Sequence, residues 1–237
     1  MKIVAVTSMS KEYYARCGWA MIDSYVTHMA NDIPLVLYNE NFSLGHSAIT
    51  EIGWELGKDY SKFCRRWASK SNARILTFAK KAYSIIHAMN NIDCDRLIWI
   101  DADCVIKQPF DSDIIAEIMP ESALASYFGV WHEQDGREYF SCETGFFVLN
   151  KTHRLFNKFA RTYSEIYNND DYHNLRRFYD GEVFGETVLR LQQEGAEFLD
   201  LSPSNKKYKT PMGKSIIKDY LTHYKAGLKD QLADDFK

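Results

Sequence analysis

Short apolar runs that suit buried strands alternate along this chain with stretches that have the periodicity of amphipathic helices. The runs expected to form strands are 3–7, 34–38, 97–100, 123–128, 145–150 and 197–201. Helices are expected from Lys11, over 74–90, 153–167 and 181–193, and in a short segment opened by Asp111 or Ser112. This alternation predicts an α/β fold with a mostly parallel sheet covered on both faces by helices. In such a sheet, ligands bind at the carboxyl ends of the strands. The segment 39–71 is mixed in composition and broken by glycines, so no element is predicted there.

Length and composition indicate one ordinary globular domain. The chain has 237 residues, of which 46% are hydrophobic and 26% charged, and nothing resembles a linker between two cores. Five cysteines without CxxC spacing predict neither a disulfide framework nor a zinc site. No apolar run reaches membrane length, and the N-terminal run is too short for a signal peptide, so we expect a cytoplasmic protein.

Charge is spread unevenly along the chain. The net charge is −3, but the segment 205–229 contains seven lysines and a single aspartate, so it carries +6 and leaves −9 elsewhere. Such a segment is either a solvated lysine face or a contact surface for an anionic partner. The acidic remainder argues against broad nucleic-acid binding.

A run built for burial ends in two carboxylates. Residues 97–110 read LIWIDADCVIKQPF, with Asp101 and Asp103 directly after four large apolar residues. Side chains two apart on an extended segment point the same way, so both carboxylates can reach one target. Two adjacent carboxylates repel each other in a half-buried place, and a bound dication removes that cost. Oxygen ligands favour Mg²⁺ or Mn²⁺.

Position distinguishes this pair from two other D-x-D triplets. Asp93 and Asp95 precede the strand and lie at its amino end, away from where a parallel sheet binds ligands. Asp111 and Asp113 stand where a helix begins, and carboxylates there cap exposed backbone N–H groups. The middle pair alone ends a buried strand, which favours a functional role for it.

The stretch LIWIDADCVIKQPF resembles the D-x-D segment of GT-A fold glycosyltransferases, especially glycogenin-like and lipopolysaccharide galactosyltransferase-like enzymes. The resemblance implies a single Rossmann-like domain over 1–237, with a nucleotide-sugar half of about 1–110 and an acceptor half, including the basic segment, of about 111–237. It also implies that Asp101 and Asp103 hold Mn²⁺ or Mg²⁺ on the diphosphate of the donor, with Ala102 beside the nucleotide.

A second anchor of the resemblance lies near the C-terminus. The segment LTHYKAGLK resembles the H-x-x-G-x-x-K element of glycogenin-like transferases. His223 would then be a third metal ligand, while Gly227 and Lys229 would bind the diphosphate. Gly227 is displaced by one position from the pattern, and the Pro-Trp that often follows is missing.

Other residues are assigned to the nucleotide by the same resemblance. Thr7 and Ser8 follow the first strand, and Tyr38, Asn39 and Glu40 end the second, where the family contacts the nucleoside. The basic residue on the helix before the D-x-D strand would be Lys80 or Lys81; because adjacent residues on a helix point apart, one of them faces the site, and we favour Lys81. An alternative role for the end of the first strand is to cap the following helix, which Ser10 would also serve.

Two carboxylates are candidates for the reaction centre. In SCETGFFVLN, a polar loop 141–144 is expected to enter a strand through Gly145, and Glu143 would contact sugar hydroxyls or act as a base. The alternative is a surface carboxylate in a hairpin. Asp180, just before a helix, corresponds to a family position near the anomeric carbon, and its alternative is helix capping.

The function implied by the resemblance is metal-dependent transfer of a hexose from a nucleoside-diphosphate sugar, preferably a UDP-sugar, to an acceptor hydroxyl. The acceptor is open, and an anionic glycan, a lipid-linked acceptor or a modified nucleic acid would suit the basic segment. One alternative is a haloacid-dehalogenase-type phosphatase with Asp101 as its nucleophile, because DADCV matches the D-x-D-x-[TV] loop of that class. That loop normally follows the first strand of the domain, however. Another alternative is a nucleotide-sugar binding module without catalysis.

Overall fold

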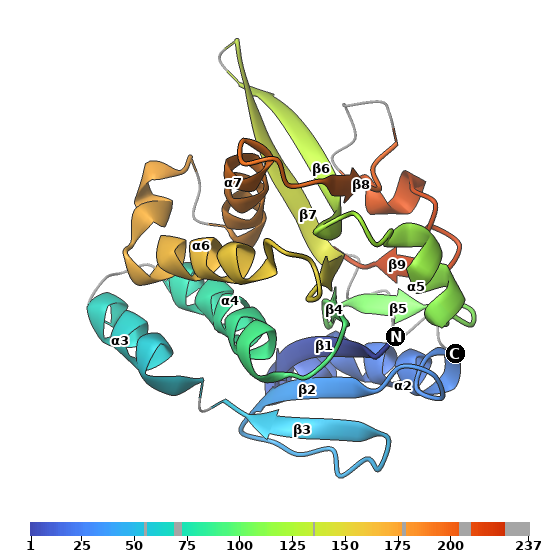
Figure 1. The fold of residues 1–237 in the computed structure, drawn as a ribbon. Helices are drawn as coiled ribbons and strands as arrows, with labels where there is room; N and C mark the ends of the chain where they lie inside the picture. Colours follow the sequence, from blue (N-terminus) through green and yellow to red (C-terminus); the bar gives the residue numbers. More distant parts are fainter. Residues whose placement is uncertain (55, 69–72, 135, 177–178, 204–209, 226–237) are drawn as a thin grey trace.

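A computed structural model of the chain describes residues 1–54, 56–68, 73–134, 136–176, 179–203 and 210–225. Within these residues, a seven-stranded sheet has the order β3-β2-β1-β4-β7-β6-β8 (Figure 1). Strand β7 is antiparallel to both neighbours, and the other strands run in one direction. The predicted α/β fold with a mostly parallel sheet is therefore confirmed.

The four parallel strands on one side of the sheet bring the D-x-D segment to its carboxyl edge. They are β1 (Ile3–Ser10), β2 (Leu35–Glu40), β3 (Ile49–Gly53) and β4 (Arg96–Ile100). All five residues of β4 are buried, because its side chains point alternately to two hydrophobic clusters. This two-sided burial explains the continuous apolar run in its sequence.

Strands β6 (Ala125–Gln134) and β7 (Arg137–Asn150) form a long hairpin that projects beyond the rest of the sheet (Figure 1). The second half of β7 pairs with β4, from Ile100 opposite Phe146 to Arg96 opposite Asn150. Its first half runs past the end of β4. Residues 141–144, expected as a loop, therefore lie inside a strand, and that prediction was wrong.

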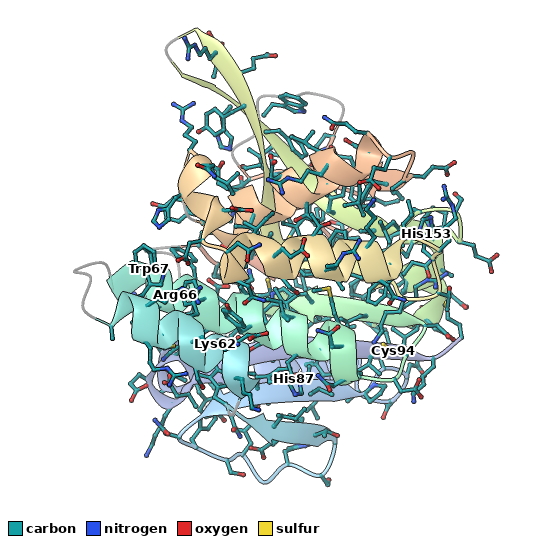
Figure 2. All side chains as sticks on the ribbon, turned by 60° about the vertical axis from the view of Figure 1, so that its left-hand side comes forward. Lys62, Arg66, Trp67, His87, Cys94 and His153 are labelled. Atoms are coloured by element: carbon teal, nitrogen blue, oxygen red, sulfur yellow. The ribbon has the colours of Figure 1, made fainter. Side chains whose placement is uncertain are left out.

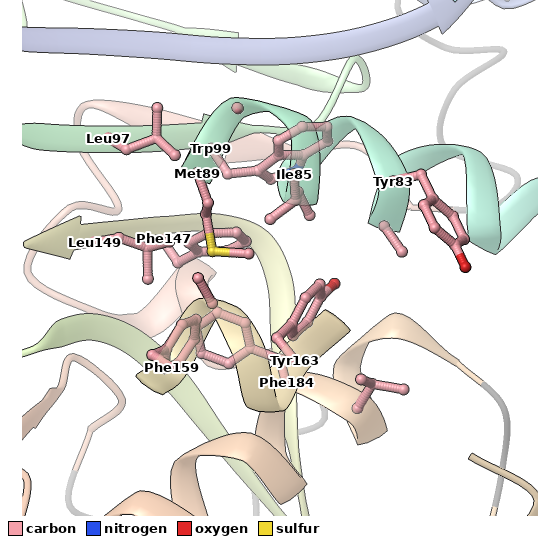
Figure 3. Packing of buried hydrophobic residues seen from close by; sticks show 14 of the residues in the cluster. Tyr83, Ile85, Met89, Leu97, Trp99, Phe147, Leu149, Phe159, Tyr163 and Phe184 are labelled. Atoms are coloured by element: carbon pink, nitrogen blue, oxygen red, sulfur yellow. The ribbon is translucent and has the colours of Figure 1, made fainter. Parts of the chain in front are cut away.

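One face of the sheet is covered by α4 (Ala73–Asn91), α6 (Phe156–Asn168) and α7 (Asp180–Gln192), with α3 (Gly57–Trp67) beside α4. Figure 3 shows their contact with the sheet. Leu97 and Trp99 of β4 and Phe147 of β7 meet Met89 of α4 and Phe184 of α7. The ring centroids of Phe147 and Phe184 are 4.7 Å apart. This packing fixes the first turn of α7 against β7.

The opposite face is covered by α2 (Trp19–His28) and α5 (Ser112–Ile118). The helix predicted from Lys11 is interrupted: α1 (Lys11–Tyr13) leads into a π-helical turn (Tyr14–Gly18) before α2. Ser10 caps α1, since its hydroxyl accepts the Tyr13 N–H at 3.2 Å. Asp111 caps α5 by accepting the N–H groups of Asp113 and Ile114.

Two three-residue strands form a small second sheet that the sequence did not predict. β5 (Cys104–Ile106) pairs antiparallel with β9 (Leu221–His223), so that Cys104 lies opposite His223. This pairing holds the C-terminal part of the described chain beside the D-x-D segment. The remaining short elements are β8 (Phe198–Asp200) and single turns at Asp171–Asn174 and Met212–Lys214.

The described cysteines are all free, as expected, and four of the five are buried. No helix within the described ranges is long and apolar enough to cross a membrane.

Candidate active site

A cleft of about 970 Å³ opens at the carboxyl edge of the parallel strands. Its volume lies within the range of small-molecule sites in proteins, which is about 300–1,000 Å³. The lining comes from the ends of β1, β2 and β4, the middle of β7, one side of α4, the first turn of α7 and the segment after β9. This is where a parallel sheet is expected to bind a ligand.

Asp101 is the first residue beyond β4, and two donors hold one of its oxygens. Its N–H still donates to the carbonyl of Gly145 at 2.8 Å, which continues the pairing of β4 with β7. Its Oδ1 accepts the indole N–H of Trp99 at 2.7 Å and lies 2.7 Å from Nζ of Lys81. Burial and the nearby Asp103 raise the pKa of Asp101, and Lys81 opposes this shift. The second oxygen, Oδ2, faces His223 at 3.9 Å.

Asp103 is arranged in the same way. Its Oδ2 accepts the hydroxyl of Tyr13 at 3.0 Å, while its Oδ1 lies 3.1 Å from Nε2 of His223. Each aspartate thus has one oxygen held by a neighbouring side chain and another turned toward the same imidazole. The sequence prediction that Asp101, Asp103 and His223 converge agrees with this geometry.

The His223 ring is fixed by contacts on several sides. Its Nδ1 lies 3.0 Å from Oε1 of Glu143, and a Cβ at position 145 would come within 2.5 Å of the ring. Gly145 therefore leaves the space that the imidazole occupies. Burial alone lowers the pKa of His223, but the hydrogen bonds to Asp103 and Glu143 outweigh it and raise the pKa to about 9.

The donor set fits a hard divalent ion. The Oδ2 of Asp101 and the Oδ1 of Asp103 lie 3.9 and 3.1 Å from Nε2 of His223. Adjacent ligands of an octahedral ion with bonds of about 2.1 Å are about 3 Å apart. Cys104 also lies near Asp103 and His223, but its thiol donates to the carbonyl of Gly145 and burial raises its pKa well above the usual value. Asp103 and His223 thus have the spacing of adjacent ligands, while Oδ2 of Asp101 lies further from Nε2, at 3.9 Å.

Lys81 is a buried cation shared by two carboxylates. Its Nζ lies 2.7 Å from Asp101 and 2.7 Å from Oδ2 of Asp180, and it donates to the Thr144 carbonyl at 2.9 Å. Burial lowers the pKa of Lys81, but the two negative charges outweigh this effect and raise it. The choice of Lys81 over Lys80 agrees with this position, although Lys80 also lines the cleft, where it pairs with Glu40.

Asp180 lies at the first turn of α7, and its negative charge is compensated by neighbouring groups. Besides Lys81, its Oδ2 accepts the hydroxyl of Thr144 at 2.5 Å. Burial raises the pKa of Asp180, but the Lys81 charge and these hydrogen bonds outweigh it and lower the pKa. A Cβ at Gly181 would collide with the carbonyl oxygen of Cys142, so this glycine permits the close approach of α7 to β7.

Glu143 is buried inside β7 rather than exposed at the tip of a hairpin. Only 2% of its side chain is accessible. Its Oε1 faces both His223 Nδ1 and Lys225 Nζ, the latter at 2.8 Å, and its Oε2 accepts the N–H of Met212 at 3.2 Å. Burial raises the pKa of Glu143, but the bonds from His223 and Lys225 outweigh it and lower the pKa. Protein donors therefore already occupy the carboxylate expected to contact a sugar or act as a base.

The residues expected around the nucleotide divide into two groups. Ser8 and Ala102 line the cleft. Thr7 and Tyr38 are fully buried and do not belong to the lining; the hydroxyl of Tyr38 bonds to Nδ1 of His87 at 2.7 Å. Of the residues expected at the end of β2, Glu40 lines the cleft, whereas Tyr38 is buried away from it, so the expected contact of Tyr38 with a nucleoside is not supported. Gly227 and Lys229 lie outside the described residues.

Several cleft residues were missed by sequence reasoning. Trp99 precedes Asp101 by two positions, so strand alternation could have placed both on one side. Tyr13, Thr144, Glu182 and Lys225 carried no local signal, since their role arises from contacts between distant segments. The other two D-x-D pairs agree with their structural interpretation, because Asp93 and Asp95 bind Lys2 and Asp111 caps α5.

The fold resembles that of solved glycosyltransferase structures of the GT-A type. The galactosyltransferase LgtC, in a complex with donor and acceptor sugar analogues, matches with a TM-score of 0.57 and 15% identity over 94% of this chain and 87% of that one. The bifunctional glycosyltransferase WbbM matches with a TM-score of 0.54 and 13% identity over 95% of this chain, which spans 46% of that one. Mouse xyloside xylosyltransferase 1 matches with a TM-score of 0.50 and 11% identity over 85% and 86%.

At sequence level, the chain matches no family model and no curated protein. The structural likeness thus shows the fold, and the chemistry has to be argued from the residues of the cleft.

Proposed function

We propose that this protein is a metal-dependent glycosyltransferase that moves a hexose from a nucleoside-diphosphate sugar, most simply a UDP-sugar, to an acceptor hydroxyl. The observation that carries the proposal is the convergence of Asp101, Asp103 and His223 at the end of β4, inside a cleft of about 970 Å³. The GT-A fold supports it independently.

In this proposal, Asp101, Asp103 and His223 hold Mn²⁺ or Mg²⁺. When bound, the ion neutralises the negative charge that grows on the diphosphate leaving group. Trp99 and Tyr13 each hold one aspartate by a hydrogen bond, so the oxygens that face His223 are oriented before a ligand arrives. Ser8 and Ala102, beside this centre, belong to the nucleotide side of the cleft.

Lys81 and Asp180 belong to the sugar side. Lys81 supplies positive charge next to Asp101, where the diphosphate would lie, and Asp180 supplies negative charge next to Lys81. Because the pKa of Asp180 is lowered, its carboxylate stays ionised, which suits the stabilisation of positive charge at the anomeric carbon more than proton transfer. Lys225, at the rim beside Glu143, adds a second cation on the side of the diphosphate or of an anionic acceptor.

The test is release of UDP from UDP-glucose and UDP-galactose, measured with and without Mn²⁺. We expect slow metal-dependent hydrolysis by the wild-type protein, reduced about 100-fold or more in Asp103→Asn, because electrostatic stabilisation of this kind contributes about 10²–10³ in rate. Asp113→Asn is the matched control, since Asp113 belongs to another D-x-D triplet and is exposed on α5. Equal turnover in Asp103→Asn and wild type would refute the proposal.

The same experiment distinguishes the alternatives. A phosphatase with Asp101 as its nucleophile would release phosphate from phosphomonoesters and bind beryllofluoride. Against this alternative, Asp101 follows the fourth strand along the chain, and its Oδ1 is engaged by Lys81 and Trp99. A binding module would retain UDP-sugar without turnover.

A further inference from the structure

Glu143 has a position that the proposed function leaves unexplained. It is a carboxylate with 2% of its side chain accessible, and it lies beside the metal centre without facing Asp101 or Asp103. We propose that Glu143 is the positioning residue of that centre: it holds the His223 imidazole so that Nε2 is presented to the metal. This inference rests on the proposed function, because it requires that the site binds a divalent ion.

The contact with Glu143 determines which nitrogen of the His223 ring carries a proton. An ionised carboxylate can only accept hydrogen bonds, so the 3.0 Å contact between Glu143 Oε1 and His223 Nδ1 requires the proton on Nδ1. A metal-bound imidazole carries one proton, and with that proton on Nδ1 the lone pair of Nε2 is free to bind. Nε2 is the nitrogen that faces Asp103 Oδ1 at 3.1 Å. Glu143 thereby keeps the proton on Nδ1, so the proton that a divalent ion would displace is the one on Nε2.

The Glu143–His223 pair is held rigidly, because each residue belongs to a different sheet. Glu143 is placed by β7, where it pairs opposite Phe128 of β6, and its Oε2 is held by the N–H of Met212. His223 is placed by β9, which pairs with β5 next to Asp103. The bond between Glu143 and His223 joins these two sheets, and the ring lies against the space left by Gly145. The imidazole therefore cannot turn over without breaking a buried charge-assisted bond.

Glu143 can raise metal affinity in two ways, through its negative charge or through its contact with His223. Removing a negative charge near a cation site weakens metal binding even without any contact. A positioning residue differs because its effect passes through the histidine. In metal sites, such partners of ligating histidines typically contribute about 10- to 100-fold in affinity. If Glu143 acts through His223, its contribution should vanish once His223 is absent.

The experiment is a double-mutant cycle on Mn²⁺ binding by the full chain without donor, followed by the EPR signal of free Mn²⁺. We expect Glu143→Gln to weaken Mn²⁺ binding by about 10-fold or more, and the same change in a His223→Ala background to weaken it less than about threefold. Equal losses in both backgrounds, or no loss in the first, would overturn the inference. If the wild-type protein itself binds no Mn²⁺, the proposed metal-dependent function is refuted. If it binds Mn²⁺ and the variants behave otherwise than expected, only the role of Glu143 is refuted.

A second measurement needs no Glu143 variant, because Glu143→Gln places an amide N–H₂ among the donors His223, Lys225 and Met212 and could fail to fold. The ¹⁵N spectrum of the histidine rings in the wild-type protein, loaded with diamagnetic Zn²⁺, reports which nitrogen of His223 carries the proton. Assignment uses His223→Ala. A proton on Nδ1 supports the inference, and a proton on Nε2 overturns it.

Discussion

Nζ of Lys81 lies 2.7 Å from Oδ1 of Asp101, and both residues line the cleft. Only 15% of the lysine side chain and 21% of the aspartate side chain are accessible. The same Nζ is 2.7 Å from Asp180, so one cation compensates carboxylates from β4 and α7. This arrangement opposes the rise in the pKa of Asp101 that burial and Asp103 cause, and it offsets part of the repulsion between Asp101 and Asp103.

Replacement of Lys81 should therefore destabilise the protein strongly. In Lys81→Met, two buried carboxylates lose their shared partner, and breaking such a pair costs about 3–5 kcal/mol. We expect a loss of this size in the free energy of unfolding, measured by urea denaturation without metal. Mn²⁺ should recover part of it, since the ion restores positive charge beside Asp101.

Lys80→Met is the control for this prediction. Lys80 pairs with Glu40 in a more accessible place, with 29% and 27% of the side chains exposed, so we expect a loss of about 1 kcal/mol or less. Similar losses for the two variants would show that the position of Lys81 between Asp101 and Asp180 has no special energetic weight.

Gly145→Ala should damage the proposed metal centre more than the fold. The new Cβ would come within 2.5 Å of His223 Nδ1 and 2.6 Å of its Cε1, so the ring must move away from Glu143 and Asp103. Overpacking of this kind costs about 1–3 kcal/mol, while displacement of a ligand should lower Mn²⁺-dependent UDP-sugar hydrolysis by about 10-fold or more. Gly53→Ala is the matched strand control, because nothing lies within 4 Å of a Cβ at that position. Unchanged hydrolysis in Gly145→Ala would contradict the placement of His223.

Gly181→Ala tests how α7 carries Asp180 to the cleft. A Cβ at position 181 would meet the backbone carbonyl of Cys142, which cannot rotate away as a side chain could. We expect α7 to shift from β7, with a loss of about 1–3 kcal/mol or more in stability. The shift should also lengthen the contact of Asp180 with Thr144 and lower turnover. Thermal unfolding and UDP release measure the two effects, and a variant that keeps both unchanged would show that the approach is not needed.

The sequence predicts those parts of the fold in which local pattern and tertiary packing agree. Strand β4 is buried on both faces and reads as a continuous apolar run, and α4 shows the spacing of a helix on a sheet. Strand β3 and helix α3 escaped prediction because β3 is a half-exposed edge strand and α3 is rich in charged residues. Their place in the fold depends on neighbours that a local window does not contain.

The site shows the same limit more sharply. The alternation of Asp101 and Asp103 can be read from the chain, but Cys104 pairs with His223 across more than a hundred residues, and three-residue strands give no periodic signal. The polar letters of 141–144 indicate a loop, yet these residues continue a strand, because Thr144 and Glu143 find buried partners in Lys81 and His223. A strand that lines the cleft thus breaks the hydrophobic pattern that identifies ordinary strands.

His87 should give the protein a measurable sensitivity to acid. His87 lies on α4 (Figure 2), and its Nδ1 bonds to the hydroxyl of Tyr38 at 2.7 Å. Burial lowers the pKa of His87, so as the pH falls through about 6.5, the unfolded chain takes up this proton before the folded chain does. The contribution of this group is therefore complete above about pH 6.5 and is lost below it.

In His87→Asn, an amide oxygen can still accept the Tyr38 hydroxyl but no proton is taken up. We expect the decrease in the urea midpoint between about pH 7.5 and about pH 5.5 to be smaller in the variant than in the wild type. Equal decreases would mean that His87 titrates alike in the folded and unfolded chains, which would contradict a lowered pKa of the half-buried imidazole.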